Sequence, residues 1–409
     1  MQSSSEAASP VRPAHVPDAL VRPYPFAGLE RTTTADPRSF LPEVHKGPAV
    51  FWADGAHHLA AGAWIPRRFE DLQKINMDSE HFSPRGMSPY GALLGESWFL
   101  LPVEADPPVH ALYRLALSPL LAASRIAVLD DKIRSYARTR MEALKPAGGC
   151  EFVTDFAFEF PIRVFLDLMG LPQEGMSQFL AWEHMILRSS NREEMTEATR
   201  SITEYLEAEC ESRRVNPKND LLTLCVEAEI EGRKLTRDEL TGFCFNLFVG
   251  GLDTVSTNMS SHFRYLAERP DQQRLLRAHP EKIPDAVEEL MRAYAGVTTS
   301  RRCIVETQIG DVTVMPGDFV MLPTMLGSND PEVFENPELI DFDRKPRHVS
   351  FGYGPHICIG IHLARRELRI AMEQALAVLP EFSLEPGAEI TSYLAGIVGP
   401  RELPLVWAR

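Results

Sequence analysis

Residues 350–376 read SFGYGPHICIGIHLARRELRIAMEQAL, a glycine-rich loop that leads into a helical segment. Cys358 lies where the loop becomes the helix. Backbone N–H groups and the positive end of a helix dipole favour a thiolate over a thiol there, and Gly360 lets the backbone pack closely beside a flat ligand. The other cysteines indicate neither a disulfide framework nor a zinc site, because they are scattered at positions 150, 210, 225, 244 and 303 with no CxxC pair. Cys358 is therefore the candidate metal ligand.

Residues 236–268 have the pattern of one long helix. A capping box of Thr236 and Glu239 predicts its start, and we expect it to run to about Glu268, ahead of Pro270, over about 48 Å. Its middle reads FVGGLDTVS, and each glycine inside a helix costs about 1 kcal/mol relative to alanine. The glycine pair therefore indicates either close helix packing or a local functional site.

The loop around Cys358 resembles the haem-binding loop F-G-x-G-x-H-x-C-x-G of the cytochrome P450 family. The matching residues are Phe351, Gly352, Gly354, His356, Cys358 and Gly360. In that family the cysteine thiolate is the proximal ligand to the iron of haem b and donates electron density that helps to break the O–O bond. The resemblance implies that Cys358 is the iron ligand; a buried cysteine in a tight turn is the alternative.

The GGLDT run resembles the acid–alcohol motif of the same family. In these oxygenases the helix is locally opened, here at Gly250 and Gly251, and leaves a groove for dioxygen beside the haem. The hydroxyl of Thr254 would donate the local hydrogen bond, and the carboxylate of Asp253 would connect it to solvent. The resemblance makes Asp253 and Thr254 the catalytic residues.

Charged residues elsewhere match two further features of the family. Glu289 and Arg292 are three apart, which alone would usually be a solvated ion pair, but with Arg344 in DFDR they resemble the family's E-x-x-R network. That network has a structural role. The two haem propionates need cationic or hydrogen-bonding partners. The candidates for that task are His110, Arg114, Arg301 and His356.

The likeness extends to the bacterial camphor monooxygenases within the family. VGGLDTV, PDAVEELMR, HICIGIHLARRE and a terminal GIV followed by LPLVW match in order and spacing from about residue 40 to 407. The resemblance implies a mainly α fold, the triangular helical prism with small β-sheets, and a monomer. It also implies electrons from NADH through a flavin-dependent reductase and a [2Fe-2S] ferredoxin, because the chain has no reductase domain of its own. An acidic ferredoxin would dock near Arg114, Lys345, Arg365 and Arg366, for which haem or core pairing is the alternative.

Departures from the camphor monooxygenases concern the substrate. Trp98 stands where those enzymes have a tyrosine that binds the substrate ketone, and Asn246 takes an aliphatic position, where it should meet a substrate oxygen or a water. Thr299 replaces an aspartate. We expect hydroxylation of an unactivated C–H bond in a compact, mostly hydrocarbon molecule with one oxygen, such as a monoterpenoid or norisoprenoid. The expected lining is Met87, Tyr90, Trp98, Met185, Ile186, Asn246, Val249, Val297, Ile397 and Val398, with core packing as the alternative for Met87, Tyr90, Met185 and Ile186.

Composition limits the classes of function. A formal net charge of −15 over 409 residues argues against nucleic acid and anionic membranes as partners. The first twenty residues do not read as a secretory signal, so we expect a cytoplasmic protein. Residues 1–40 are rich in Pro, Ser and Ala and predict an extended arm, and residues 41–409 predict one domain. Helical periodicity dominates from about 105 to 295, with β signals near 48–53 and 303–321.

Two rival functions remain. A class I terpene cyclase is also helical, and NDLLTLCVE places Asn219, Asp220, Thr223 and Glu227 in its magnesium motif, but Asp130 and Asp131 lack the third acid of the partner motif. A peroxide-driven peroxygenase or a haem sensor would keep the haem but have little use for the acid–alcohol pair.

Overall fold

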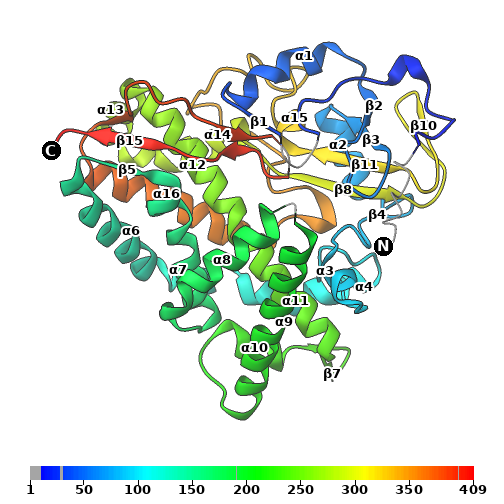
Figure 1. The fold of residues 1–409 in the computed structure, drawn as a ribbon, viewed down its shortest axis with the longest axis horizontal. Coiled ribbons are helices and arrows are strands. Elements are labelled where there is room, and N and C mark those ends of the chain that lie inside the picture. Colours follow the sequence, from blue (N-terminus) through cyan, green and yellow to red (C-terminus); the bar gives the residue numbers. More distant parts are fainter. Residues whose placement is uncertain (1–10, 28–30, 190, 395) are drawn as a thin grey trace, which may run out of the picture.

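The computed structural model describes residues 11–27, 31–189, 191–394 and 396–409. Helices make up 52% of the chain and strands 13%, so the fold is mainly α, as predicted. The outline is triangular, with the helices filling most of it and the larger sheet confined to one corner (Figure 1). The helices are α1 Leu41–Lys46, α2 Phe69–Met77, α3 Tyr90–Leu94, α4 Val109–Leu117, α5 Ala123–Ala127, α6 Asp130–Leu144, α7 Glu159–Met169, α8 Met176–Leu187, α9 Arg192–Val215, α10 Leu221–Glu227, α11 Arg237–Gly251, α12 Asp253–Glu268, α13 Pro270–Ala278, α14 Ile283–Ala293, α15 Thr324–Ser328 and α16 Ile361–Val378.

The largest sheet has five strands, in the order β2 Val50–Asp54, β3 Gly62–Pro66, β11 Phe319–Pro323, β8 Thr298–Cys303 and β4 Phe82–Ser83. Val320 pairs with Arg301 in the antiparallel β11–β8 ladder, which fixes the register of the strand that carries Arg301. The smaller sheets are β1 Thr32–Thr33, β13 Ser392–Tyr393 and β14 Gly399–Pro400; β12 Phe382–Leu384, β15 Pro404–Trp407 and β5 Gly149–Glu151; and the hairpins β9 Thr307–Ile309 with β10 Val312–Val314 and β6 Glu229–Ile230 with β7 Arg233–Lys234.

Two large apolar clusters hold the helices together. One joins the buried faces of α6, α12, α14 and α16, and the other joins those of α7, α8, α9, α10 and α11. The consecutive helices α11 and α12 therefore connect the two halves of the core. Because α16 begins directly after the cysteine loop and packs into the first cluster, the loop is held against the centre of the molecule.

The expected single helix of residues 236–268 is two helices. The capping box is confirmed, since Thr236 accepts from the backbone of Glu239 and Glu239 accepts from the backbone of Thr236. The helix does not continue, however: Leu252 has φ −103° and ψ −72° and separates α11 from α12. The Thr254 hydroxyl donates to the Gly250 carbonyl at 2.9 Å, so a side chain takes a backbone acceptor at the break.

Close packing does not explain Gly250. A Cβ placed on Gly250 would meet no atom within 4 Å, whereas a Cβ on Gly242 of the same helix would lie 2.2 Å from the Phe99 carbonyl oxygen. Gly242 is thus a packing glycine, and Gly250 faces open space. The second explanation that the sequence left open, a local functional site, is the one that the geometry supports for Gly250.

The residues that match the E-x-x-R pattern form a buried network. Glu289 and Arg292 have exposed fractions of 0%. Arg292 donates to Glu289 through Nε at 2.9 Å and Nη2 at 2.8 Å, and Arg344 Nε donates to Glu289 at 3.1 Å. One carboxylate thus joins α14 to the loop that carries Arg344, close to the start of the cysteine loop.

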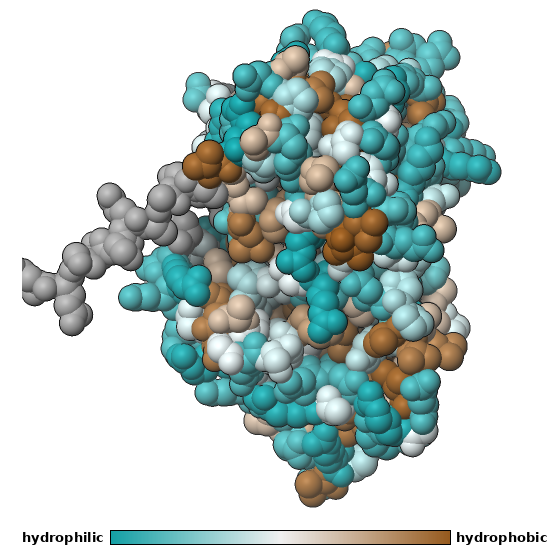
Figure 2. Space-filling view, turned by 90° about the vertical axis from the view of Figure 1, so that its right-hand side faces the viewer, coloured by the Kyte–Doolittle hydropathy of each residue, from teal (hydrophilic) through white to brown (hydrophobic). Residues whose placement is uncertain are grey.

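The N-terminal residues 11–27 and 31–40 lie on this body. Val16, Tyr24 and Phe26 are buried, and β1 pairs with β13 near the C-terminus. Among the described helices, none by itself has the length and apolar composition needed to cross a bilayer; the segments Val109–Ala127 and Asp130–Ala147 meet that test only as a pair bent by 66°. In the face shown in Figure 2, hydrophilic residues predominate and apolar ones form separate patches.

The magnesium motif expected for a terpene cyclase is used for structure. Asp220 is the N-cap of α10, where it accepts from the backbone N–H of Thr223 at 2.8 Å, and it accepts from Arg213 Nε at 2.7 Å. Within the described ranges, no group of three or more His, Cys, Asp or Glu side chains is arranged to hold a metal ion. The cyclase interpretation is therefore wrong, because its key carboxylate is occupied by a buried arginine.

Candidate active site

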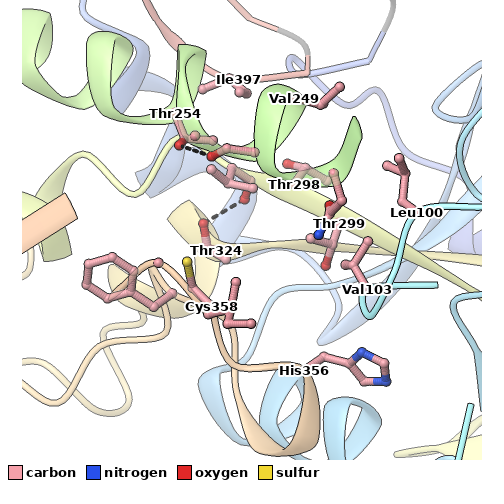
Figure 3. Close-up of a pocket in the computed structure, with 18 of the residues that line it drawn as sticks. Leu100, Val103, Val249, Thr254, Thr298, Thr299, Thr324, His356, Cys358 and Ile397 are labelled. Carbon is pink, nitrogen blue, oxygen red and sulfur yellow. Dashed lines mark hydrogen bonds between the residues drawn. The ribbon is translucent and has the colours of Figure 1, made fainter. Parts of the chain in front are cut away.

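A cavity of about 1230 Å³ lies between the distal helices α11 and α12 and the cysteine loop. Cys358 lines its lower wall, and Thr254 lines its upper wall. In Figure 3 the sulfur of Cys358 points upward into this space, toward the side on which Thr254 and Val249 lie. His356 lies to one side of the same loop. The thiol and the helix break, which are about a hundred residues apart in sequence, thus face one cavity.

The backbone of the loop presents the thiol to this cavity. Gly352 and Gly354 have φ values of 74° and 67°, which side chains disfavour, and the N–H of Cys358 donates to the Phe351 carbonyl at 2.9 Å. Burial raises the pKa of Cys358, while the N–H of Gly360 and the charges of Arg114 and Arg365 act to lower it. The Cys358 side chain is exposed on the cavity, and a thiol with an N–H donor and positive charges beside it suits a metal-bound thiolate.

Cationic and imidazole groups gather beside the loop. Arg301 is only 5% exposed, and burial lowers its pKa to about 10. The rings of His110 and His356 have centroids 4.1 Å apart, and burial lowers the pKa of His110 to about 4 and that of His356 to about 3. Arg114 donates to the Ile357 carbonyl at 3.0 Å and also lines the cavity.

This cluster fits the carboxylates of haem. His110 Nε2 and His356 Nδ1 are buried and have no hydrogen-bond partner among the described residues. Arg301 donates only to the Asn76 side chain and to a backbone carbonyl, without an ion pair in the described part of the chain. Buried donors and cations without anionic partners match what two propionates need. Gly250, Gly251 and Gly360 line the same cavity, where a Cβ on Gly360 would lie 3.9 Å from the Cys358 sulfur.

The side chains of Asp253 and Thr254 point in different directions. Thr254 lines the cavity, but Asp253 is 1% exposed and is absent from the lining. Asp253 is instead paired with Arg188, and it accepts from Thr257 Oγ1 at 3.0 Å. Contrary to the expected direct link to solvent, the carboxylate is thus held toward α8 in this conformation. Sequence reasoning missed Arg188, because no local pattern links the end of α8 to a helix 65 residues later.

Comparison with known proteins supports the same conclusion as the geometry. A model of the cytochrome P450 family matches residues 170–398. The probable cytochrome P450 127A1 of Sinorhizobium fredii is 35% identical over 402 residues, 97% of each chain. The chain belongs to the cytochrome P450 family. The mycinamicin IV hydroxylase/epoxidase of Micromonospora griseorubida is 30% identical and covers 94% of this cytochrome P450 and 98% of its own length.

Solved structures agree with this assignment. The crystal structure of CYP101C1 superposes with a TM-score of 0.86 at 33% identity, and that of CYP101J2 with 0.87 at 28% identity; each covers 98% of this cytochrome P450 and 100% of its own chain. Both belong to the camphor hydroxylase family. The predicted family and fold are confirmed. This cytochrome P450 is a monooxygenase with a haem-thiolate cofactor, and it uses dioxygen and a redox partner.

Six of the ten residues expected to line the substrate pocket line the cavity: Met87, Tyr90, Asn246, Val249, Val297 and Ile397. Trp98, Met185, Ile186 and Val398 do not. The Trp98 indole N–H donates to Glu96 at 2.5 Å, and its ring packs on Phe245 at 5.1 Å, so Trp98 turns into the core. Ile186 is buried in the apolar cluster that joins α7, α8, α9, α10 and α11, and Met185 packs against the same cluster. Val398 is buried in another cluster, with Tyr24 and Phe26 of the N-terminal segment. Leu100, Val103 and Leu187, which the sequence did not single out, line the cavity instead.

Two polar side chains of the cavity, Asn246 and Tyr90, each have an oxygen atom without a hydrogen-bond partner in the described part of the chain. Asn246 Nδ2 donates to the Leu101 carbonyl at 3.0 Å, and because a carbonyl only accepts, this contact fixes which end of the amide carries the oxygen. Within the described ranges, neither Asn246 Oδ1 nor Tyr90 Oη has a partner, and neither is among the fully buried atoms without one, so both open onto the cavity. The hydroxyls of Thr298 and Thr299 lie on β8, beside Arg301.

Proposed function

We propose that this monooxygenase hydroxylates an unactivated C–H bond of a small, mostly hydrocarbon substrate with one oxygen, such as a monoterpenoid or norisoprenoid. A [2Fe-2S] ferredoxin with an NADH-dependent flavin reductase would supply the electrons. The observation that carries the proposal is the cavity with Cys358 on one wall and Thr254 on the other, which is lined mainly by apolar side chains. Six free cysteines suit the reducing cytoplasm, where we place it as a monomer.

Haem bound through Cys358 would supply the activation of dioxygen, and His110, Arg114, Arg301 and His356 would hold its propionates. The chain's own groups control water and protons. The Thr254 hydroxyl, already 2.9 Å from the Gly250 carbonyl, is placed to hold a proton at the helix break. Asp253 would link that hydroxyl to the protein's charged groups once it leaves Arg188.

The basic residues proposed for ferredoxin docking are only partly available. Arg365 is paired with Glu288 at 2.6 Å, and Arg366 with Asp130 at 2.5 Å. Lys345 is exposed and forms no ion pair within the described segments. An acidic partner would therefore meet Lys345 together with arginines whose charge is shared with internal carboxylates.

The first test of the proposed function is a ligand titration of the ferric enzyme with a panel of monoterpenoids and norisoprenoids. A ligand that displaces water from the iron will move the Soret band to shorter wavelength, and we expect micromolar binding for at least one member of the panel. Product should then form faster with ferredoxin, reductase and NADH than with hydrogen peroxide. The absence of any spectral shift would reject the substrate class, and equal rates with peroxide would favour the peroxygenase alternative.

The free oxygen of Asn246 predicts a preference for substrates that donate a hydrogen bond. An alcohol should bind more tightly than its matching ketone, and Asn246→Leu should weaken alcohol binding about fivefold while changing ketone binding little, because a net hydrogen bond contributes about 1 kcal/mol. Dissociation constants from the Soret titration measure both effects. Val249→Leu is the matched control on the same helix, and it should affect alcohol and ketone alike. Equal loss for both ligands in Asn246→Leu would contradict this role.

A further inference from the structure

Three buried ionisable side chains, Glu183, Arg188 and Asp253, act on one another behind the break between α11 and α12. Glu183 lies on α8, Arg188 follows the end of that helix, and Asp253 begins α12. Glu183 is 2% exposed, Asp253 is 1% exposed, and the Arg188 side chain is 7% exposed. The charges of Asp253 and Arg188 both act on Glu183. The Arg188 guanidinium therefore forms an ion pair with Asp253 and acts on Glu183 through its charge.

Arg188 uses only one side of its guanidinium. Its Nη2 donates to Asp253 and to Thr257 Oγ1 at 3.1 Å, and its Cζ atom lies 4.3 Å from the ring centroid of Tyr393. The Nε of Arg188 is buried with no acceptor, and Oε1 of Glu183 is buried with no donor, among the residues that the structure describes. A spare donor and a spare acceptor in one buried cluster are costly, and they indicate a second arrangement in which Arg188 pairs with Glu183.

The charge balance indicates that Glu183 holds a proton while Arg188 is bound to Asp253. Ionising both carboxyls would leave one buried negative charge without compensation. Burial, assisted by the charge of Asp253, raises the pKa of Glu183 to about 8, although Arg188 acts against this. Below about pH 8 the cluster therefore consists of a cation, an anion and a neutral acid.

Among the described residues of α7 and α9, we find no other charged side chain that could balance the charge of Glu183. The faces that α7 and α9 bury beside α8 are apolar apart from Thr199, Thr203, Cys210 and Arg213, and Arg213 is already paired with Asp220 at 2.7 Å. The half-buried Tyr205 of α9 packs on Trp182 of α8, and burial raises the pKa of its hydroxyl, so it stays neutral. Glu174, in the turn before α8, is exposed.

We propose that Glu183 stores the proton that Asp253 delivers toward Thr254. Arg188 moves from Asp253 to Glu183, the O–H bond of Glu183 breaks, and the proton passes to the Asp253 carboxylate. The cluster has no net charge before or after this exchange, and nothing is oxidised or reduced, so no buried ion is left unpaired. Asp253, now neutral and released from Arg188, can turn toward the cavity. The inference rests on the proposed role of Asp253 in proton delivery, and Glu183 is a positioning residue that acts through Asp253.

Infrared difference spectroscopy of the ferric holoenzyme tests the stored proton without turnover. The wild type should show the carbonyl stretch of a buried, protonated carboxylic acid, and this band should disappear with a midpoint near pH 8. Glu183→Gln should lack the band, and Glu193→Gln, on the exposed N-terminal turn of α9, should keep it. A wild-type spectrum at pH 7 without a band that Glu183→Gln removes would overturn the proposal.

Steady-state kinetics test the proton transfer from Glu183 to Asp253. Glu183→Gln keeps the size of the side chain but carries no proton to give, so kcat should fall about tenfold or more with little change in KM, and more electrons should end in hydrogen peroxide. The wild-type kcat should fall as pH rises through about 8, because Glu183 then loses its proton, and Glu183→Gln should lack this fall. Glu183→Asp should restore part of the pH dependence.

The double variant separates this proposal from the proposed function. If Glu183 acts through Asp253, Glu183→Gln combined with Asp253→Asn should lose no more kcat than Asp253→Asn alone. An additive loss, or a wild-type pH profile in Glu183→Gln, would refute the transfer. A full kcat in Asp253→Asn would instead refute the proposed role of Asp253, while the infrared result would still decide whether Glu183 holds a proton.

Discussion

Cys358→Ala will abolish thiolate-ligated haem and monooxygenase activity. The variant removes the cysteine thiol that lines the cavity, while the donors and cations of the propionate cluster remain. Haem will therefore bind weakly and without a sulfur ligand, and the reduced, carbon monoxide-treated protein will lack the long-wavelength Soret band of thiolate ligation. Loss of a catalytically essential ligand leaves activity at background, which makes this the largest expected effect. Reduced carbon monoxide spectra and product formation measure both consequences.

Cys150→Ala is the matched control for this prediction. Cys150 is half-buried on β5, where burial raises the pKa of its thiol to about 12, so it stays protonated and unreactive. The control should keep the wild-type carbon monoxide spectrum and the wild-type rate. If Cys358→Ala retained the thiolate band, the assignment of the iron ligand would be wrong.

The second large effect concerns folding rather than chemistry. Glu289→Ala will destabilise the protein by about 3–5 kcal/mol, because it leaves the cation of Arg292 buried without its carboxylate. Domains are stable by only about 5–15 kcal/mol, so little folded, haem-bound protein should remain at 37 °C. Arg344 and the backbone N–H of Asp341 lose the same acceptor. Urea unfolding followed by circular dichroism, with the yield of haem-bound protein, measures the loss.

Glu338→Ala provides the control for this network. Glu338 is exposed beside Leu339, whose carbonyl accepts from Arg292, so the exchange changes a neighbouring surface charge and keeps the buried contacts. We expect its free energy of unfolding to lie within about 0.5 kcal/mol of the wild-type value. Unfolding of Glu289→Ala at the wild-type urea concentration would mean that the network contributes no net stability.

The haem side of the cavity could be predicted from the sequence to a large extent. The loop that carries Cys358 is short, so its glycines, its cysteine and the following helix fix their relative positions within a few residues. The capping box at Thr236 is local in the same way, and the structure has it as expected. The helix break was harder to place, because the sequence showed a weak point at Gly250 but not that the helix would divide at Leu252.

The substrate side could be predicted less well. Trp98 has the size and the N–H of a substrate-binding residue, yet it pairs with Glu96 and leaves the cavity wall to Leu100 and Val103. Side chains of a cavity wall come from many segments, and each can turn either way when a neighbour offers a better partner. Alignment of one residue with a relative does not fix that choice.

The sequence by itself determined the family, the mainly helical fold and the thiolate loop, because these depend on spacings within single segments. Only the tertiary structure showed that Asp253 is held by Arg188, with Glu183 beside them. Those groups come from two separate helices, and their protonation depends on burial and on one another's charge, which exist only once the chain has folded.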